Sequence, residues 1–408
     1  DNIKVKNITQ NKEILMKKIA ILGFGVVGSG VAEVLTQNKS IIEKKLAESI
    51  EIKYILDLRD FPDSPFADKV IHDFNIILDD PEISIVAEMM GGSHPAYDFS
   101  KACLLAGKNV VTSNKEVVSK FGTELLEIAK QNNVRYLFEA SVGGGIPIIR
   151  PINNDLTANK ITSIDGILNG TTNYILTQMN EHGTSFAEAL KDAQSKGYAE
   201  ADPTADIEGI DAARKICILS ALSFGKCLCA DAISRQGITQ ITADDFAIAK
   251  SLGYTIKLIG HSEIIKSKIY ADVAPRFIPL SNPLAHISDV YNGILVGANM
   301  LDNVLFYGKG AGKLPTASAV TADIIDIAEK MGTAACPTIS WSNAEGDDIS
   351  SEEEYKTQRC IILCGRVEGA KYIGELNKSV IITDKISIKD CISLASEYNT
   401  EYTVYSIL

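Results

Sequence analysis

Up to about residue 150, short apolar runs alternate with stretches whose apolar residues recur at helical spacing. The segment KKIAILGFGVVGSGVAEVLTQN (17–38) begins as an apolar run of strand length, passes through a glycine-rich turn and continues as an amphipathic helix. Such alternation is typical of a mostly parallel sheet that carries helices on both faces, so the pattern predicts an α/β, Rossmann-type doubly wound sheet. Its further strands are expected at 51–60, 83–92, 109–115 and 134–145.

Beyond residue 150 the rhythm changes. ITSIDGILNGTTNYILTQM (161–179) predicts a strand, a turn at 170–173 and a helix, and 302–328 predicts a strand, a second glycine loop and a long helix. We therefore expect a second α/β domain and a small C-terminal α/β module. The expected divisions are a leader at 1–15, a dinucleotide-binding domain at 16–150, the second domain at 151–305, a return segment packing on the first domain at 306–340, an acidic linker at 341–356 and the C-terminal module at 357–408.

A cluster of carboxylates opens a segment that otherwise reads as a core helix. GYAEADPTADIEGIDAARK (197–215) holds five carboxylates, and the nine residues that follow, ICILSALSF, carry no charge. On one continuous helix, Glu208, Asp211 and Lys215 would fall at i, i+3 and i+7, and their stripe would run on into the apolar stretch. These charges therefore either pair with one another or face a cavity. An ordinary Asp–Lys pair on a solvated face is the alternative.

Composition narrows the class of protein. The chain has 408 residues and a formal net charge of -12, which argues against a general nucleic-acid binder. No apolar run reaches the length of a membrane span, and residues 1–15 lack the apolar core of a secretory signal. Eight cysteines in a chain of this length indicate reduced thiols in the cytoplasm. The pair Cys227 and Cys229 has no partners at metal-ligand spacing, so we expect no zinc site.

The glycine turn carries the first chemical signal. A GxGxxG placed between a strand and a helix fits a dinucleotide, because its backbone can approach the pyrophosphate and the helix start offers N–H donors. Asp57, near the end of the second strand, suits an adenosine ribose, whereas Arg59 suits a 2′-phosphate, so NAD and NADP both stay open. The expected cofactor-binding turn consists of Gly23, Phe24, Gly25, Val26, Val27 and Gly28.

Two further loops follow predicted parallel strands, where ligands of such sheets bind. TSNK places Lys115 just after one strand, and EASVGGG places Glu139 and three glycines after another. Backbone carbonyls of the glycine-rich loop could hold a monovalent cation, or the loop could simply leave room for a nicotinamide. Lys115 taken alone could equally be a solvated lysine at a helix start.

Several motifs in order make the chain resemble homoserine dehydrogenases over residues 16–340. They are GFGVVG, TSNK, EASVGGGIPI, LNGTTNYIL and, above all, AQSKGYAEADPTADIEGIDAARK (193–215), which fits the signature A-x3-G-aromatic-small-x2-D-P-x2-D-aliphatic-x-G-x-D-x3-K. The resemblance implies reversible NAD- or NADP-dependent interconversion of L-homoserine and L-aspartate 4-semialdehyde, on the route to threonine, methionine and isoleucine. It further implies that the second domain binds the substrate and forms a homodimer or homotetramer.

Site roles follow from the same resemblance. Lys215 corresponds to the proton donor and acceptor, and Lys115 to a second lysine beside the carbonyl and the nicotinamide. The implied substrate-binding residues are Glu200 and Asp211, supported by Asp206; the implied cofactor neighbours are Gly197, Gly310 and Gly312; the implied ligands of a sodium or potassium ion are the backbone carbonyls of Glu139, Val142, Gly144 and Ile146.

Two other functions remain as alternatives. A semialdehyde dehydrogenase would work through a thioester and would need a reactive cysteine, yet Cys103 lies in an apolar helical stretch and no cysteine falls in the predicted site loops. A non-catalytic NAD(P)-sensing protein would use the tail to signal the bound state. The tail is shorter than the ACT domain that ends many family members, so it is expected to be ACT-like or degenerate, and whether it binds a regulator such as threonine stays open.

Overall fold

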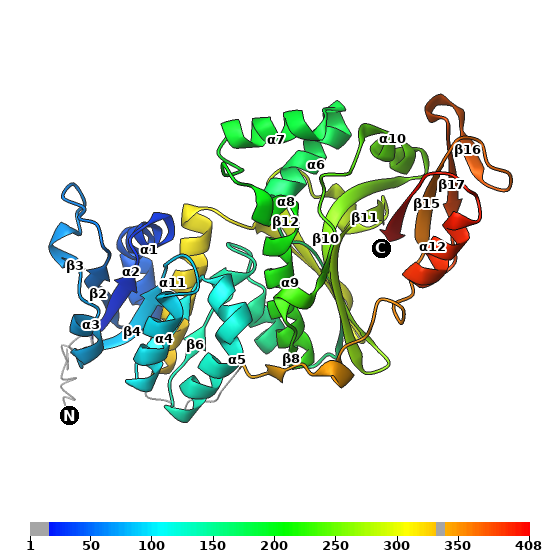
Figure 1. Cartoon of the computed structure of the whole chain (residues 1–408). Helices are drawn as coiled ribbons and strands as arrows, with labels where there is room; N and C mark the ends of the chain where they lie inside the picture. Colours follow the sequence, from blue (N-terminus) through cyan, green and yellow to red (C-terminus); the bar gives the residue numbers. More distant parts are fainter. Residues whose placement is uncertain (1–15, 332–338) are drawn as a thin grey trace, which may run out of the picture.

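The computed structural model describes residues 16–331 and 339–408. The expected leader, and residues 332–338 of the expected return segment, lie outside the described residues. Figure 1 shows the nucleotide-domain sheet at one end of the molecule, a larger sheet in the middle and the C-terminal strands at the other end.

The first sheet has six parallel strands in the order β3-β2-β1-β4-β5-β6. This is the doubly wound order of dinucleotide-binding folds, and it confirms the predicted fold class. The strands are β1 (Met16–Leu22), β2 (Ser49–Leu56), β3 (Val70–Ile71), β4 (Ile83–Glu88), β5 (Asn109–Thr112) and β6 (Tyr136–Leu137). Its helices are α1 (Val26–Gln37), α2 (Lys39–Leu46), α3 (Asn75–Asp79), α4 (Ala96–Leu105) and α5 (Lys115–Gln131).

The apolar runs of this sheet are continuous because both faces are covered. Along β1, Ala20 and Leu22 point into the core formed with α4 and α5, whereas Ile19 and Ile21 point into the core formed with α1 and α11 (Lys313–Lys330). The helix α11 comes from far along the chain and lies beside α1, drawn in yellow in Figure 1. Lys313 at its start forms an ion pair with Glu33 of α1, at 2.8 Å.

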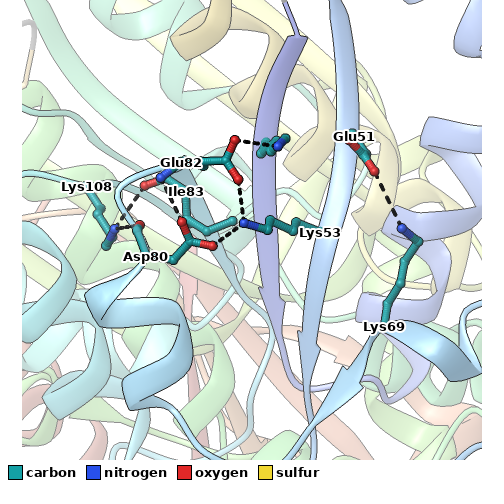
Figure 2. A network of polar contacts seen from close by, with 8 residues as sticks. Glu51, Lys53, Lys69, Asp80, Glu82, Ile83 and Lys108 are labelled. Atoms are coloured by element: carbon teal, nitrogen blue, oxygen red, sulfur yellow. Dashed lines mark hydrogen bonds and ion pairs between the residues drawn. The ribbon is translucent and has the colours of Figure 1, made fainter.

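A network of charged side chains lies at the amino ends of β4 and β5, away from the carboxyl ends where ligands of such sheets bind. Figure 2 shows the ammonium of Lys53 between the carboxylates of Asp80 and Glu82, and the buried Lys108 donating to the backbone oxygens of Asp80 and Ile83. Burial lowers the pKa of Lys108. This network joins β2, β4 and the start of β5 and has a structural role.

The second sheet has ten strands and mixed directions, in the order β13-β12-β7-β10-β11-β18-β15-β17-β16, with β9 also paired to β11. Its strands are β7 (Ile161–Ile167), β9 (Ser234–Arg235), β10 (Tyr254–Ile265), β11 (Lys268–Pro279), β12 (Tyr291–Ala298), β13 (Asp302–Lys309), β15 (Arg359–Cys364), β16 (Lys371–Ile373), β17 (Lys378–Ile382) and β18 (Tyr402–Ile407). The remaining helices are α6 (Gly170–His182), α7 (Phe186–Ser195), α8 (Thr204–Ile207), α9 (Ile210–Phe224), α10 (Ala243–Ser251) and α12 (Ile388–Ser396).

The C-terminal residues join the central sheet through one strand. β18 pairs in parallel with β11, Arg276 opposite Ser406 and Phe277 opposite Ile407, so the C-terminal strands continue the sheet of the second domain. The acidic segment before them also packs: β14 (Ser342–Asn343) pairs with β8 (Lys226–Cys227), and Trp341 lies buried against Phe138.

Three expected elements differ from the structure. The turn expected at 170–173 is the first turn of α6, which already begins at Gly170 after its cap Asn169. The strand expected at 134–145 is limited to Tyr136–Leu137, because a short 3-10 turn begins at Glu139. The single helix expected through Asp211 and Lys215 is broken at Gly209, whose φ of 75° ends α8 and precedes α9. Glu208 is therefore exposed and lies outside the face that Asp211 and Lys215 share, so that part of the prediction was wrong.

Candidate active site

The glycine turn lies between β1 and α1, and two of its glycines are required by space. Gly23 has a φ of 88°, and a Cβ on Gly28 would lie 2.0 Å from the carbonyl oxygen of Gly23. A Cβ on Gly25 would meet nothing within 4 Å, so the turn is open at this residue. A cavity of about 500 Å³ adjoins it, lined by residues of the turn and of the ends of β2 and β4, among them Gly23, Gly25, Asp57, His72, Met89 and Gly91. This open backbone beside a largely apolar cavity fits a dinucleotide.

The other residues of the turn differ in burial and in their contacts. The ring of Phe24 packs in the core, 5.1 Å from the ring of Phe61, while its backbone N–H donates to Asp57 at 2.8 Å. Val26 is exposed and Val27 is half-buried at the first turn of α1. Phe24 therefore holds the turn against β2, whereas the first turn of α1 is the part that remains free for a phosphate.

Asp57 and Arg59, which we expected to favour different cofactors, bind each other. The guanidinium of Arg59 donates to both carboxylate oxygens of Asp57, at 3.0 and 3.1 Å, and its backbone N–H adds a third bond. The Arg59 pairing, together with the N–H of Phe24, lowers the pKa of Asp57 to about 2, so Asp57 is ionised at neutral pH. The Arg59 side chain is still 65% exposed.

Lys215, Asp211 and Lys115 form a cluster where the two domains meet, with Lys215 and Asp211 buried and Lys115 partly exposed. The ammonium of Lys215 donates to Asp211 and to the backbone oxygen of Leu168, both at 2.7 Å. The other carboxylate oxygen of Asp211 lies 3.0 Å from Lys115, the first residue of α5. The side chain of Lys215 is 9% exposed, so it does not lie on a solvated face.

Asp211 and Lys115 each stabilise the ionised form of the other. Although burial alone would raise the pKa of Asp211, the two lysines hold it well below its usual range. The carboxylate of Asp211 is in turn the main cause that raises the pKa of Lys115. A permanently ionised aspartate thus fixes two ammonium groups at one point.

Sequence reasoning missed Asn169, which caps α6 and orders the acids. Its side-chain oxygen accepts from the N–H of Thr172, and its amide donates to Asp206 at 2.7 Å and to Asp211 at 3.0 Å. Burial raises the pKa of Asp206. An asparagine directly before GTTN was a readable helix-cap signal.

Glu200 and Gly197 lie on the neighbouring turn after α7. The hydroxyl of Thr171 holds this turn by donating to the backbone oxygen of Tyr198 at 2.7 Å. Glu200 is exposed, and its carboxylate has no hydrogen bond or ion pair within the described parts of the chain. Gly197, with a φ of 73°, makes the turn and does not line the cavity beside the glycine turn. The structure therefore places these two near the start of α6 without bringing them into the lysine cluster.

The glycine-rich loop after β6 is buried against the second glycine loop. The carboxylate of Glu139 accepts from the backbone N–H groups of three successive residues, 148–150, at 2.6 to 2.9 Å. Gly144 has a φ of 56°, and a Cβ there would lie 2.2 Å from the carbonyl oxygen of Gly310. Gly312 caps α11, so both loops reach the nucleotide domain together. The side chain of Glu139 is thus already engaged, and only backbone carbonyls are left for an ion.

The environment of Cys103 does not favour thioester chemistry. Cys103 lies within α4 and is fully buried, and burial raises the pKa of its thiol to about 12. A thiol of this kind is protonated at neutral pH and is a poor nucleophile. This observation weighs against the semialdehyde dehydrogenase alternative.

Comparison with known proteins bears on the whole chain. Residues 23–139 match the family model described as homoserine dehydrogenase, NAD binding domain, and 147–325 match that described as homoserine dehydrogenase. A homoserine dehydrogenase of Lactococcus lactis is 43% identical over 77% of this chain and 75% of its own length.

The crystal structure of a homoserine dehydrogenase from Thiobacillus denitrificans superposes with a TM-score of 0.87 at 32% identity, covering 97% of this chain and 99% of that one. A hyperthermophilic archaeal homoserine dehydrogenase solved in complex with NADPH is 28% identical, with a TM-score of 0.67 over 79% of this chain and 100% of its own. The chain therefore belongs to the homoserine dehydrogenase family, NAD(P)-dependent oxidoreductases that act on a CH–OH group.

Proposed function

We propose that this chain interconverts L-homoserine and L-aspartate 4-semialdehyde with Lys215 as its proton donor and acceptor. The observation that carries this proposal is the ion-paired cluster of the buried Lys215 and the partly exposed Lys115 around the buried Asp211, next to the cleft of the nucleotide domain. In the reducing direction the aldehyde carbon gains a hydride and its oxygen gains a proton. NAD(P) supplies the hydride, and the protein must supply the proton.

The geometry of Lys215 suits this task. Two of its three N–H donors are used by Asp211 and by the oxygen of Leu168, which leaves the third for a substrate oxygen. Lys115 adds a second positive charge that stabilises the negative charge growing on that oxygen. In the oxidising direction, neutral Lys215 takes the hydroxyl proton while hydride leaves the carbon.

The acids divide the remaining work. Both oxygens of Asp211 are taken by lysines, so we assign this residue mainly to fixing them, together with any contact it makes to substrate. Asp206 in α8 and Glu200 after α7 lie near the start of α6, and we assign both carboxylates to the ammonium of the substrate.

Initial rates test the reaction directly. With L-homoserine and NAD⁺ or NADP⁺ we expect reduced cofactor to form without added phosphate. No turnover with either cofactor, or a phosphate-dependent acyl phosphate from the semialdehyde, would overturn the proposal in favour of the two alternatives.

For the cofactor we propose NADP, with NAD accepted more weakly. The backbone N–H groups of Phe24 and Arg59 each donate to one oxygen of Asp57, whereas the exposed guanidinium of Arg59 can turn to a 2′-phosphate and bind it through two N–H groups. Arg59→Ala should raise the KM for NADP⁺ by roughly tenfold and leave that for NAD⁺ nearly unchanged. An equal change for both cofactors contradicts this choice.

We also propose a sodium or potassium ion held by the backbone carbonyls of Glu139, Val142, Gly144 and Ile146. The support is a buried, glycine-rich loop whose one carboxylate is already bonded to backbone N–H groups, which leaves carbonyl oxygens as the ligands of choice for a hard cation. Rates should rise on adding Na⁺ or K⁺ to protein kept in tetramethylammonium salts. Identical rates in all three salts would contradict a role for a sodium or potassium ion in the reaction.

We propose a homodimer or homotetramer in the cytoplasm, within threonine, methionine and isoleucine biosynthesis. The edge strand β13 exposes Leu305 and Tyr307, and the turn before it exposes Met300 and Leu301. Such a patch favours a covering partner. In the described ranges no helix is long and apolar enough to cross a membrane, and the seven described cysteines are free. Light scattering that finds only a 44.0 kDa species would exclude the oligomer.

A further inference from the structure

A fully buried carboxylate lies beneath the candidate active site without a cationic partner. Glu88 is the last residue of β4 and has no exposed surface. One oxygen accepts from the backbone N–H of Met90 and the other from the hydroxyl of Thr112, both at 2.6 Å. No lysine, arginine or histidine of the described residues pairs with it. A buried acid held only by neutral donors is costly, so its position in the fold requires a reason.

The bonds of Glu88 continue as a closed ring between two segments. The hydroxyl oxygen of Thr112 accepts from the N–H of Asn114 at 2.9 Å. The amide of Asn114 returns to the first segment by donating to the backbone oxygens of Gly92, at 2.7 Å, and Met90, at 3.3 Å. The ring thus joins the end of β4 and the loop after it to the end of β5 and the turn after it.

Each segment carries one half of the reaction site. Met89, Met90 and Gly91 line the cavity beside the glycine turn. Asn114 caps α5 by accepting from two backbone N–H groups, and the next residue is Lys115, which reaches Asp211. The ring therefore couples the loop at the cofactor cleft to the helix start that aims the second lysine.

We propose that Glu88 is a positioning residue that keeps the cofactor loop, residues 89–92, in register with Lys115. The inference rests on the proposed function, because it assumes that Lys115 acts beside the substrate. Glu88 touches neither substrate nor reacting atoms. Its effect is on the relative placement of hydride transfer and proton transfer, where an error of about 1 Å is worth up to two orders of magnitude in rate.

The charge on Glu88 sets the direction of its hydrogen bond with Thr112. When ionised, it accepts from Thr112, whose oxygen is then free to accept from Asn114. When protonated, its own O–H donates to that oxygen, and the hydroxyl hydrogen of Thr112 loses its acceptor. The groups that face Glu88 are Thr112 and Asn114 and, from β6, the buried hydroxyl of Tyr136, which has no hydrogen-bond partner within residues 16–331 and 339–408. Burial raises the pKa of Glu88 to about 7. The hydrogen bond therefore runs from Thr112 to Glu88 above neutral pH and from Glu88 to Thr112 below it, where the hydroxyl hydrogen of Thr112 has lost its acceptor.

The test compares three variants by steady-state kinetics. Glu88→Gln and Thr112→Val should each lower kcat by roughly tenfold or more with KM for homoserine changed less than about threefold. Thr112→Ser, which keeps the hydroxyl, should restore most of kcat. We expect the kcat of the wild type to fall below pH 7, and this fall should disappear in Glu88→Gln and persist in Thr112→Ser.

Controls separate positioning from folding and from failure of the wider proposal. Asp165→Asn makes the same carboxylate-to-amide change at a buried acid that pairs with His261 in the other sheet, and it should leave kcat unchanged. If Glu88→Gln fails to fold, the pair Thr112→Val and Thr112→Ser decides the question. Wild-type kcat and pH profile in Glu88→Gln or Thr112→Val would overturn the inference. If Lys215→Ala also keeps turnover, the proposed function fails as well; if Lys215→Ala is inactive, only the role of Glu88 fails.

Discussion

At the scale of single residues, Asp211 is the point on which the site depends. It is buried, yet its pKa lies well below the usual range because Lys215 and Lys115 both contact it. An aspartate with a lowered pKa stabilises the folded protein above its unfolded pKa of about 4, and this contribution is lost as the pH falls toward the folded value.

Asp211→Asn removes this charge and leaves two ammonium groups close together. We expect a loss of roughly 3 to 5 kcal/mol in the free energy of unfolding at pH 7, because a buried pair loses one partner. Below pH 4 the difference from wild type should shrink. Denaturant unfolding at pH 7 and at pH 3.5 measures both; an equal difference at the two pH values contradicts the linkage.

At the scale of elements, the turn between β1 and α1 separates folding from binding. A Cβ on Gly28 would meet the backbone of Gly23, which cannot move without breaking the turn, whereas a Cβ on Gly25 meets nothing. Gly28 is thus required by the fold, whereas Gly25 leaves space beside the cavity.

The two alanine variants should therefore differ. Gly28→Ala should lower Tm by several degrees and abolish cofactor binding. Gly25→Ala should keep Tm close to wild type and raise the KM for NADP⁺ by roughly tenfold, because the methyl occupies the approach of the pyrophosphate. Thermal melts and initial rates check both, and unchanged KM in a folded Gly25→Ala would show that the phosphate binds elsewhere.

The same scale shows what the sequence could predict. Strands covered on both faces, such as β1, are visible as apolar runs, and the position of Lys115 after β5 follows from them. The break at Gly209 was missed because a glycine inside a helical pattern is locally tolerated. The backbone at Gly209 has a φ of 75°, and a Cβ there would lie 3.0 Å from Val273 of β11, a contact between residues far apart in the chain that spacing does not reveal.

Some residues of the proposed site have a local signal in the sequence, whereas others are recognised only from the structure. Asn169 had a local signal as a helix cap, and Glu88 stands out as one acid in an apolar strand. The pairing of Asp57 with Arg59, and of Lys115 with Asp211 across the domains, depends on side-chain directions that no spacing encodes.

At the scale of the whole molecule, one sheet connects the second domain to the C-terminal strands. The pairing of β11 with β18 places Tyr405 on Phe277, with ring centres 4.9 Å apart and both side chains buried. Neither ring is among the groups that bond to Lys215, Asp211 or Lys115, so the contact should affect stability without affecting chemistry.

Tyr405→Ala tests this separation. We expect a loss of roughly 3 to 5 kcal/mol in unfolding free energy from the cavity it leaves, with kcat of the folded protein unchanged. Tyr405→Phe, which keeps the ring, is the matched control and should lose far less. A large fall in kcat at a temperature where Tyr405→Ala is fully folded would mean that the C-terminal strands act on the site.

The central claim is that the ammonium of Lys215 exchanges the proton while NAD(P) exchanges the hydride. The most direct measurement is kcat of Lys215→Ala alongside its Kd for NADPH, with Lys196→Ala as control, since Lys196 is an exposed lysine paired with Asp192. We predict a fall in kcat of about 10² to 10⁴-fold with Kd nearly unchanged, and wild-type rates for Lys196→Ala. Lys215→Ala that binds NADPH and still turns over homoserine at the wild-type rate would contradict the account.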